Sequence, residues 1–472
     1  MNQVFSGGRS MTRVPESAVG RDGADGGLPA PPIAARQRGR AGNVQPLATI
    51  PTLRVNTAPR SHSRELCMRE AALLIFCDPQ PEVCSRLWGL SDAEWQRLLR
   101  WLDTSGLALY FFDRVTETKQ SEMLPSHVLA RLQQNLVDNT ARTEGLIAEL
   151  SAIHREFQRA ALRYATLKGF SLWPSSVPSP ELRSQLDLDF LIAEESAVEA
   201  RSILERRGYH LCAISGRSWE FKNDELPGRS LKDLYKDVPF RSVELHIEAC
   251  AKNDSSLLAR TEINHFRDID MPVLSPVDLF LGQGMHAFKH ICSEFSRTAH
   301  LLEFRRHVIA RYGDVAFWSE LRARAEEFPR APIALGVITL LITRVMGRFA
   351  PASFTGWTVD QLPVSARLWV QLYGTRVVFA SFPGSKLYLL LQKELAVSGI
   401  PSKRSLRQAL LPLRLPPLIA RARANETPLM RVRRYCTQVR FILFRLRFHI
   451  VEGVRYLCES LRWQQHTNGV TS

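Results

Sequence analysis

Leu186-Asp187-Leu188-Asp189-Phe190-Leu191-Ile192 is an apolar run that carries two carboxylates. Side chains alternate between the faces of a β-strand, so Asp187 and Asp189 point one way while their apolar neighbours point into the core. Carboxylates about 7 Å apart along a strand repel each other unless a cation lies between them. Carboxylate oxygens on a rigid strand suit Mg²⁺, which binds through one or two carboxylates and substrate phosphates. The run therefore predicts a strand with a Mg²⁺ site, and the alternative is a solvated face near a sheet edge.

A second alternating run, Val243-Glu244-Leu245-His246-Ile247-Glu248, supplies further carboxylates. The alternation places Glu244, His246 and Glu248 on one face of a strand. A third carboxylate would complete a two-metal site and assist deprotonation of an acceptor hydroxyl, and we prefer Glu244 for that role. His246 shares the face, where it could act as a proton shuttle or make a structural hydrogen bond.

A glycine turn lies upstream of both runs, in Thr166-Leu167-Lys168-Gly169-Phe170-Ser171. A glycine directly after an apolar strand lets backbone N–H groups approach phosphate oxygens. Lys168 and Ser171 could add a charge and a hydroxyl to such a phosphate site. The simpler interpretation is a turn without a ligand.

The order of apolar runs and helical patterns predicts an α+β fold. Strands are expected at 165–167, 186–192, 209–214 and 243–247, with a helix at 197–207 between the second and third. The expected organisation is a disordered basic segment at 1–60, a helical region at 61–160, a mixed-sheet core at 161–275, a second helical region at 276–400 and a basic amphipathic tail at 401–472.

Charge and cysteine usage favour a cytoplasmic protein. The net charge of +15 resides at the two ends, since residues 401–463 hold fourteen basic residues against three acidic ones and residues 1–64 hold nine against three. Eight cysteines without a Cys-x-x-Cys pair are typical of reduced thiols, and no apolar signal sequence opens the chain. The most apolar stretch, 331–343, is too short to span a bilayer and is expected to be a buried helix.

The basic tail contains one long amphipathic pattern. Its apolar positions repeat at helical spacing and are Val432, Tyr435, Val439, Ile442, Leu446, Ile450, Leu457 and Leu461. The other side interleaves arginines with Phe441, Phe444 and Phe448. Such a helix could lie on an anionic membrane, bind nucleic acid, or pack on both sides within the protein. We prefer the membrane surface to nucleic acid.

Two histidines, His286 and His290, stand four residues apart in a helical pattern. This spacing can hold Zn²⁺, but the sequence offers no neighbouring third ligand besides Cys292. Helix packing or hydrogen bonding to a substrate is the preferred interpretation.

The ordered series of these motifs resembles a known family. It comprises Leu167-Lys168-Gly169, Arg183 four residues before Asp187-Leu188-Asp189, Gly208-Tyr209, Val243-Glu244-Leu245-His246, and Leu274-Ser275-Pro276-Val277-Asp278 followed by His286 and Lys289-His290. The series is similar to the bacterial uncharacterised nucleotidyltransferase family of the polymerase-β-like superfamily, over about residues 70–310.

The resemblance implies a nucleotidyltransferase fold with helical flanks. It implies that Asp187, Asp189 and Glu244 bind Mg²⁺ and that Gly169 approaches the triphosphate. Arg183 matches an arginine of the family, for which we expect phosphate contact or bracing of the aspartates.

The expected activity is Mg²⁺-dependent transfer of a nucleoside monophosphate from a nucleoside triphosphate to an unknown hydroxyl-bearing acceptor. Phe170 and Leu186 stand where the superfamily usually has small residues. The departures around Gly169, which are Phe170 and a longer gap to Asp187 than superfamily glycine motifs usually show, motivate one alternative, a nucleotide-binding regulatory protein without turnover. The other alternative is a toxin-like enzyme that nucleotidylates RNA or protein, with the basic tail as its grip on RNA.

Overall fold

A computed structural model describes most of the chain. The described residues are 60–77, 81–223, 233–237, 241–249, 256–294, 296–397, 406–411 and 427–471. The expected disordered segment at 1–60 lies outside this part, apart from Arg60, which begins helix α1. The proline-rich start of the tail and Cys250 also lie outside it.

The described strands form one mixed sheet of seven in the order β3-β4-β5-β2-β1-β7-β6. Their bounds are β1 Tyr164–Leu167, β2 Asp187–Ala193, β3 His210–Ser215, β4 Ser218–Lys222, β5 Ser242–Glu248, β6 Thr261–Phe266 and β7 Ile269–Leu274. The central pair β2 and β5 is parallel, as is β1 with β7, and the other neighbours are antiparallel. The sheet and its flanking helices confirm the α+β fold class.

The strands expected at 165–167, 186–192, 209–214 and 243–247 correspond to β1, β2, β3 and β5. Three strands, β4, β6 and β7, were not predicted. In β6 the polar residues Glu262 and Asn264 flank Ile263, Glu262 and Ile263 are both exposed, and β7 contains Pro272. In β6 and β7 the alternation of apolar and polar residues is too weak to predict a strand without knowledge of the neighbouring strand.

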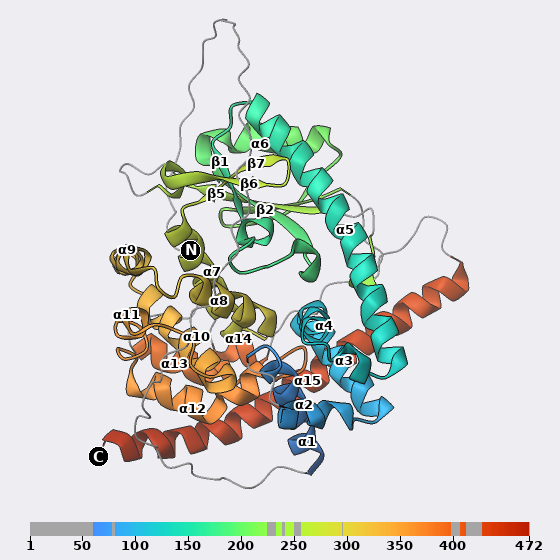
Figure 1. The fold of residues 1–472 in the computed structure, drawn as a ribbon, viewed down its shortest axis with the longest axis vertical. Coiled ribbons are helices and arrows are strands. Elements are labelled where there is room, and N and C mark those ends of the chain that lie inside the picture. The colour runs from blue at the N-terminus through green and yellow to red at the C-terminus, as the bar shows by residue number, and fades with distance from the viewer. Residues whose placement is uncertain are drawn as a thin grey trace, which may run out of the picture.

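Helices α5 (Ser126–Arg159) and α6 (Ala197–Arg206) cover one face of the sheet. Leu146, Leu150, Ile153 and Phe157 of α5 are buried in the same cluster as Phe190 of β2. These four positions form one buried face of α5. Figure 1 shows α5 continuing past the sheet toward α3 and α4.

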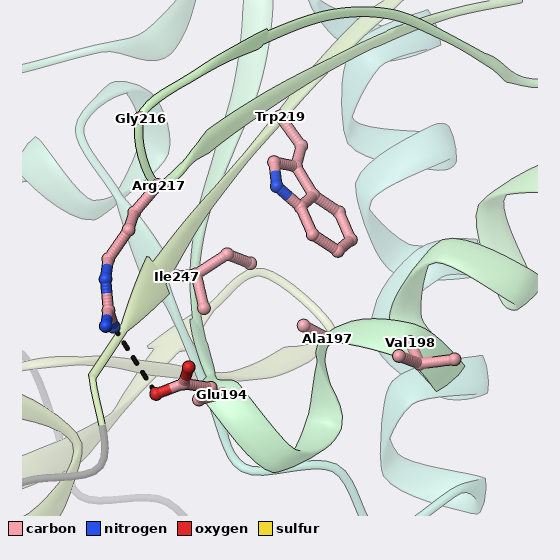
Figure 2. Close-up of a pocket in the computed structure, with 7 residues that line it drawn as sticks. All are labelled: Glu194, Ala197, Val198, Gly216, Arg217, Trp219 and Ile247. Atoms are coloured by element: carbon pink, nitrogen blue, oxygen red, sulfur yellow. Dashed lines mark hydrogen bonds and ion pairs between the residues drawn. The ribbon is translucent and has the colours of Figure 1, made fainter. Parts of the chain in front are cut away.

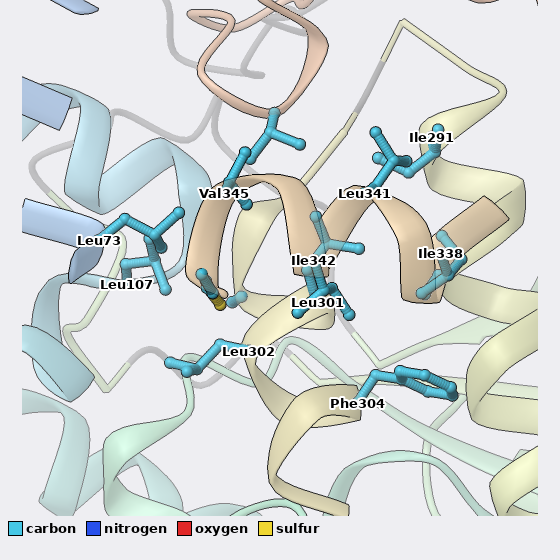
Figure 3. Packing of buried hydrophobic residues seen from close by; sticks show 14 of the residues in the cluster. Leu73, Leu107, Ile291, Leu301, Leu302, Phe304, Ile338, Leu341, Ile342 and Val345 are labelled. Atoms are coloured by element: carbon cyan, nitrogen blue, oxygen red, sulfur yellow. The ribbon is translucent and has the colours of Figure 1, made fainter. Parts of the chain in front are cut away.

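The remaining helices form a body beside the sheet (Figure 1). Their bounds are α1 Arg60–Leu74, α2 Pro81–Trp88, α3 Asp92–Ser105, α4 Ala108–Glu117, α7 Pro276–Ile291, α8 Thr298–Ala310, α9 Val315–Glu326, α10 Ala331–Met346, α11 Ala352–Thr355, α12 Val364–Val378, α13 Tyr388–Val397, α14 Leu406–Leu410 and α15 Pro428–Thr471. The two helical regions expected on either side of the sheet share one apolar core. In Figure 3, Leu73 and Leu107 from the first region lie near Leu302 and Val345 from the second.

Helix α10 contains the apolar stretch 331–343 and is the buried helix that the sequence predicts. Ala334, Val337, Ile338 and Leu341 have no exposed surface. Among the described residues, no helix combines the length and hydropathy required to cross a membrane.

Helix α15 lies along the helical body and turns one face toward it (Figure 1). Phe448, Tyr456 and Trp463 are buried on that face. Glu452 accepts hydrogen bonds from the hydroxyl of Ser385 at 2.9 Å and the backbone N–H of Lys386 at 3.1 Å. The predicted apolar stripe faces solvent instead, since seven of its eight residues, all except Ile442, are exposed. The described part of this helix therefore does not pack on both sides.

Candidate active site

The carboxylates predicted from two separate runs meet on the two central strands. Strands β2 and β5 pair in parallel with Asp189 opposite Glu244 and Leu191 opposite His246. Ligand atoms of Asp189, Glu244 and His246 lie within 4.8 Å of one another. This register, which neither run shows by itself, turns three side chains into one candidate metal site.

Polar contacts hold this group in place. Oδ1 of Asp189, which is 5% exposed, lies 2.8 Å from Nζ of Lys168 and 3.2 Å from Nε2 of His246. Nε2 of His246 is also 3.5 Å from Oε2 of Glu244, and the hydroxyl of Ser218 on β4 donates to the other oxygen of Glu244. Buried carboxylates need such partners because water no longer solvates their charge.

Asp187 lies outside the compact group of Asp189, Glu244 and His246 but belongs to the same electrostatic site. Burial, together with the charge of Asp189, raises the pKa of Asp187 to about 6 despite the opposing charges of Lys168 and Arg183. A carboxylate with a raised pKa is short of positive charge, and a bound divalent cation would supply it.

The pKa values of Glu244 and His246, the two residues beside Asp189, shift in opposite directions. The hydrogen bond from His246 lowers the pKa of Glu244 well below its usual range, although burial opposes this shift. Burial disfavours the charged form of His246, but hydrogen bonds to Asp189 and Glu244 outweigh it and raise the pKa of His246. Glu244 is therefore a firmly anionic oxygen donor, which suits a metal ligand.

Glu248, the other acidic residue of β5, has a structural role. Its carboxylate accepts the backbone N–H of Leu257 at 2.6 Å and the hydroxyl of Ser256 at 2.8 Å. These bonds hold the start of a short 3₁₀ helix, Leu257–Arg260. The choice of Glu244 over Glu248 as third carboxylate is consistent with this geometry.

The glycine turn follows β1 and brings Lys168 to the carboxylates. Lys168 and Gly169 both have a positive φ, of 53° and 47°, and Lys168 combines it with a ψ of −159°. For a lysine this conformation costs on the order of 1 kcal/mol or more, and such strain concentrates at functional sites. A Cβ on Gly169 would also come within 2.4 Å of the amide end of the Gln185 side chain, which would then have to move, so the positive φ is the stronger reason for glycine here.

Ser171 is placed differently from a phosphate ligand. It is 2% exposed, and its hydroxyl donates to the Lys168 carbonyl at 2.8 Å in the turn of the 3₁₀ helix Gly169–Leu172. Its role in nucleotide binding stays a prediction.

Arg183 faces a small cavity between the sheet and the helical body. Its Nε lies 3.1 Å from Oε1 of Glu303 on α8. Arg183, Lys168, Glu303 and two histidines contribute to the lining of this cavity of about 80 Å³. The cavity adjoins the carboxylate group through Lys168. Phosphate contact by Arg183 stays a prediction, and its ion pair with Glu303 was not foreseen.

A second hollow of about 210 Å³ lies elsewhere on the sheet (Figure 2). Ile247 and Trp219 line it, together with Glu194 and Arg217, whose side chains approach to 3.5 Å. Ile247 follows His246 on β5 and therefore points to the face opposite the carboxylates. This hollow is separate from the candidate active site.

Ser218, His300 and Glu303 are site residues that the sequence does not reveal. Ser218 follows Gly216-Arg217 at the start of an unpredicted strand, and the other two lie in a helix without a motif. Only the antiparallel pairing of β4 with β5 and the packing of α8 bring them to the site.

Comparison with known proteins identifies a family for most of the described core. The family described as uncharacterised nucleotidyltransferase matches residues 91–346, from the N-cap of α3 to the end of α10. The match includes the carboxylates, the glycine turn, Arg183 and the cavity. No curated protein matches the chain. Nucleotidyltransferases typically use divalent metals, and the buried group of Asp189, Glu244 and His246 provides suitable ligands. The chain belongs to the uncharacterised nucleotidyltransferase family.

Proposed function

We propose that the protein transfers a nucleoside monophosphate from a nucleoside triphosphate to a hydroxyl-bearing acceptor. The pairing of Asp189 with Glu244 on adjacent parallel strands, beside Lys168 with its positive φ, is the observation that supports this activity best. Asp187, Asp189 and Glu244 would hold Mg²⁺, because all three offer carboxylate oxygens at one region of the sheet. Bound Mg²⁺ supplies charge stabilisation for the triphosphate.

The transfer itself is a displacement at the α-phosphorus. The acceptor oxygen forms a bond to this phosphorus, the bond to the bridging oxygen breaks, and pyrophosphate leaves with the electron pair. The hydroxyl proton leaves toward the carboxylate face, where Glu244 and His246 lie. The lowered pKa of Glu244 favours a ligand role, since an efficient general base has a pKa near the working pH.

Lys168 would change partners when the triphosphate binds. Without nucleotide its ammonium balances Asp189, and this attraction, together with those of Glu244 and Asp187, raises the pKa of Lys168 although burial opposes the charge. A divalent cation at Asp189 would release the ammonium toward phosphate oxygens. Arg183 would stay with Glu303 and contribute positive charge to the same cavity.

Label transfer tests the proposed activity directly. Each nucleoside triphosphate, labelled at the α-phosphate, is incubated with full-length protein, Mg²⁺ and fractionated small molecules, RNA or protein. We expect pyrophosphate release together with label in one fraction, and neither with Asp189→Asn. Label in RNA or protein would establish the toxin-like alternative. Nucleotide binding without pyrophosphate release in any fraction would contradict transfer and favour the regulatory alternative. The Gln185 side chain supports that alternative, because it packs against Gly169, where the triphosphate is expected to approach.

The exposed side of α15 supports a second proposal, attachment to an anionic membrane surface. Leu446, Ile450 and Leu457 are more than half exposed, and Arg440 and Arg447 are exposed on the same helix. Apolar insertion combined with basic residues, each worth about 1 kcal/mol near anionic lipid, can hold a protein to a membrane without a spanning helix.

Vesicle sedimentation tests this attachment with matched variants. We expect full-length protein to sediment with anionic vesicles, less at high salt, and Leu446→Glu with Ile450→Glu to abolish this. Val137→Glu with Val198→Glu changes apolar residues on α5 and α6 that are more exposed still, and it should have no effect. Equal binding by both double variants would rule out α15 as the attachment site.

A further inference from the structure

Three histidines from two helices meet at the wall of the cavity beside the active site. His286 and His290 come from α7, one turn apart, and His300 comes from the first turn of α8. Their ring centroids are 4.5 to 4.9 Å apart, and each offers a nitrogen within 4.8 Å of the others. The spacing of His286 and His290 suggested a metal pair in the sequence, and the packing of α8 adds the third ligand.

The nitrogens are close enough for one ion. A tetrahedral metal bound to nitrogens at about 2.1 Å separates those nitrogens by about 3.4 Å. Side-chain rotations that move each ring by about 1 Å would therefore close the group of histidines around a metal.

A buried carboxylate orients one of the rings. Nδ1 of His300 lies 3.6 Å from Oε2 of Glu303, which is 2% exposed. Glu303 is fixed in turn by the hydroxyl of Tyr110 at 3.0 Å and by Arg183 at 3.1 Å. Metal-binding histidines usually direct their other ring nitrogen to a carboxylate or a carbonyl group in this way. The arrangement leaves Nε2 of His300 for a metal.

The surroundings keep two of these imidazoles neutral. Burial lowers the pKa of His286, and the neighbouring histidines lower it further. Burial also lowers the pKa of His300, against the attraction of Glu303. Neutral imidazole is the form that binds metals.

We propose that His286, His290 and His300 bind one transition-metal ion, with Zn²⁺ the best match, and leave a coordination position open toward the cavity. Three histidines with one open position is a ligand set of catalytic zinc sites. The open position follows from the cavity, because His286 and His300 are part of its lining. An oxygen of a ligand in the cavity could occupy it.

The neighbouring charges select the kind of metal. Lys168, Arg183 and Arg297 are the cations that act on His286 or His300. Lys168 is paired with Asp189 and Arg183 with Glu303, which reduces their repulsion of a metal. The remaining repulsion by these cations disfavours Mg²⁺, which also needs oxygen ligands. Metals with a strong affinity for imidazole can overcome this repulsion. Zinc here and Mg²⁺ at the carboxylates would therefore occupy different sites in one protein.

Zinc titration of the full-length protein tests the proposal without reference to transferase activity. Protein stripped with a chelator is titrated with Zn²⁺ against a chromogenic competitor, in excess Mg²⁺ to occupy the carboxylates. We expect one tight zinc per chain, and an affinity at least about 100-fold lower for His300→Ala. His265→Ala, a change at an exposed histidine paired with Asp270, should bind zinc as the unchanged protein does. Glu303→Gln should lose about tenfold as a positioning variant.

The carboxylate group provides the decisive second comparison, because it also contains a histidine. Asp189→Asn should keep the tight zinc site. Loss of zinc from Asp189→Asn but not from His300→Ala would overturn the proposal and assign zinc to the carboxylates.

Cobalt spectroscopy keeps the proposal testable if His300→Ala fails to fold. Co²⁺ bound to the unchanged protein through three imidazoles should give the intense visible absorption of a four-coordinate ion. A weak, octahedral-type spectrum, or no metal retained, would contradict the proposed site.

Discussion

The carboxylates of β2 and β5 and the histidines of α7 and α8 lie on two sides of Lys168 and Arg183, but their construction differs. In the first group Asp189 and Glu244 are each held by an opposite charge or a hydrogen-bond donor. In the second, His286 and His300 are kept neutral by burial. The difference shows how one cavity region can offer carboxylate oxygen ligands and imidazole nitrogen ligands within a short distance.

The secondary structures behind the two groups explain their different visibility. A strand puts residues i and i+2 on one face, and strand pairing adds a neighbour in register. A helix puts residues i and i+4 on one face, and the third ligand must come from whichever helix packs beside it. The sequence pattern therefore indicates the carboxylates clearly, whereas for the histidines it indicates only His286 and His290 and not His300.

The largest expected effect comes from Asp189→Asn. The substitution removes a ligand charge at nearly constant volume, so the protein should fold while label transfer falls by about 10³-fold or more, which corresponds to about 4 kcal/mol. Turnover with α-labelled nucleoside triphosphate measures it, and circular dichroism checks the fold. Retention of full activity would show that the carboxylate group is not the catalytic site.

Glu244→Gln should have the next largest effect. We expect turnover to fall about 10²-fold, the scale of losing a positioned acid–base group or a metal ligand. Mn²⁺ affinity, measured by calorimetry, should fall as well, because the lowered pKa makes Glu244 a strong anionic donor. Unchanged Mn²⁺ affinity with reduced turnover would instead assign Glu244 to proton transfer alone.

Lys168→Met tests both groups at once, because Lys168 pairs with Asp189 and also acts on His286. The change removes the charge that moves between Asp189 and phosphate, so nucleoside triphosphate affinity should fall about tenfold, or about 1.4 kcal/mol. Zinc affinity at the histidines should stay equal or rise, since a nearby positive charge is lost. Equilibrium dialysis with labelled nucleotide and the zinc titration measure both. A parallel loss of zinc would indicate a disturbed fold.

Asp187→Asn should change the stability of the metal-free protein, and the size of the change should depend on pH. Because the folded protein holds the pKa of Asp187 at about 6, above the usual value of 3.8, the carboxyl group favours folding at low pH and this contribution is lost as pH rises through 6. Asparagine does not ionise, so in chelator the variant should gain about 1–3 kcal/mol relative to the unchanged protein between pH 4 and pH 8. Denaturant unfolding at both pH values measures this. A constant difference across this range would contradict the raised pKa.

The C-terminal helix shows what amphipathic spacing leaves undecided. The sequence predicts a continuous helical pattern, and α15 confirms it over 428–471. Which side packs is set by partners outside the pattern, because Ser385 and Lys386 bind Glu452 and Glu394 binds the indole of Trp463 at 2.8 Å. The apolar stripe therefore faces outward although its spacing alone is typical of a buried face.

The sequence by itself determined the central strands, the α+β class and the predicted carboxylates Asp187, Asp189 and Glu244, because alternation along a strand is a local property of the chain. Only the tertiary structure decided that Asp189 pairs with Glu244, that Glu248 caps a 3₁₀ helix, that Gln185 packs on Gly169, and that His300 joins His286 and His290. These contacts join residues from separate elements. Strand register and helix packing depend on the whole core, which local spacing does not encode.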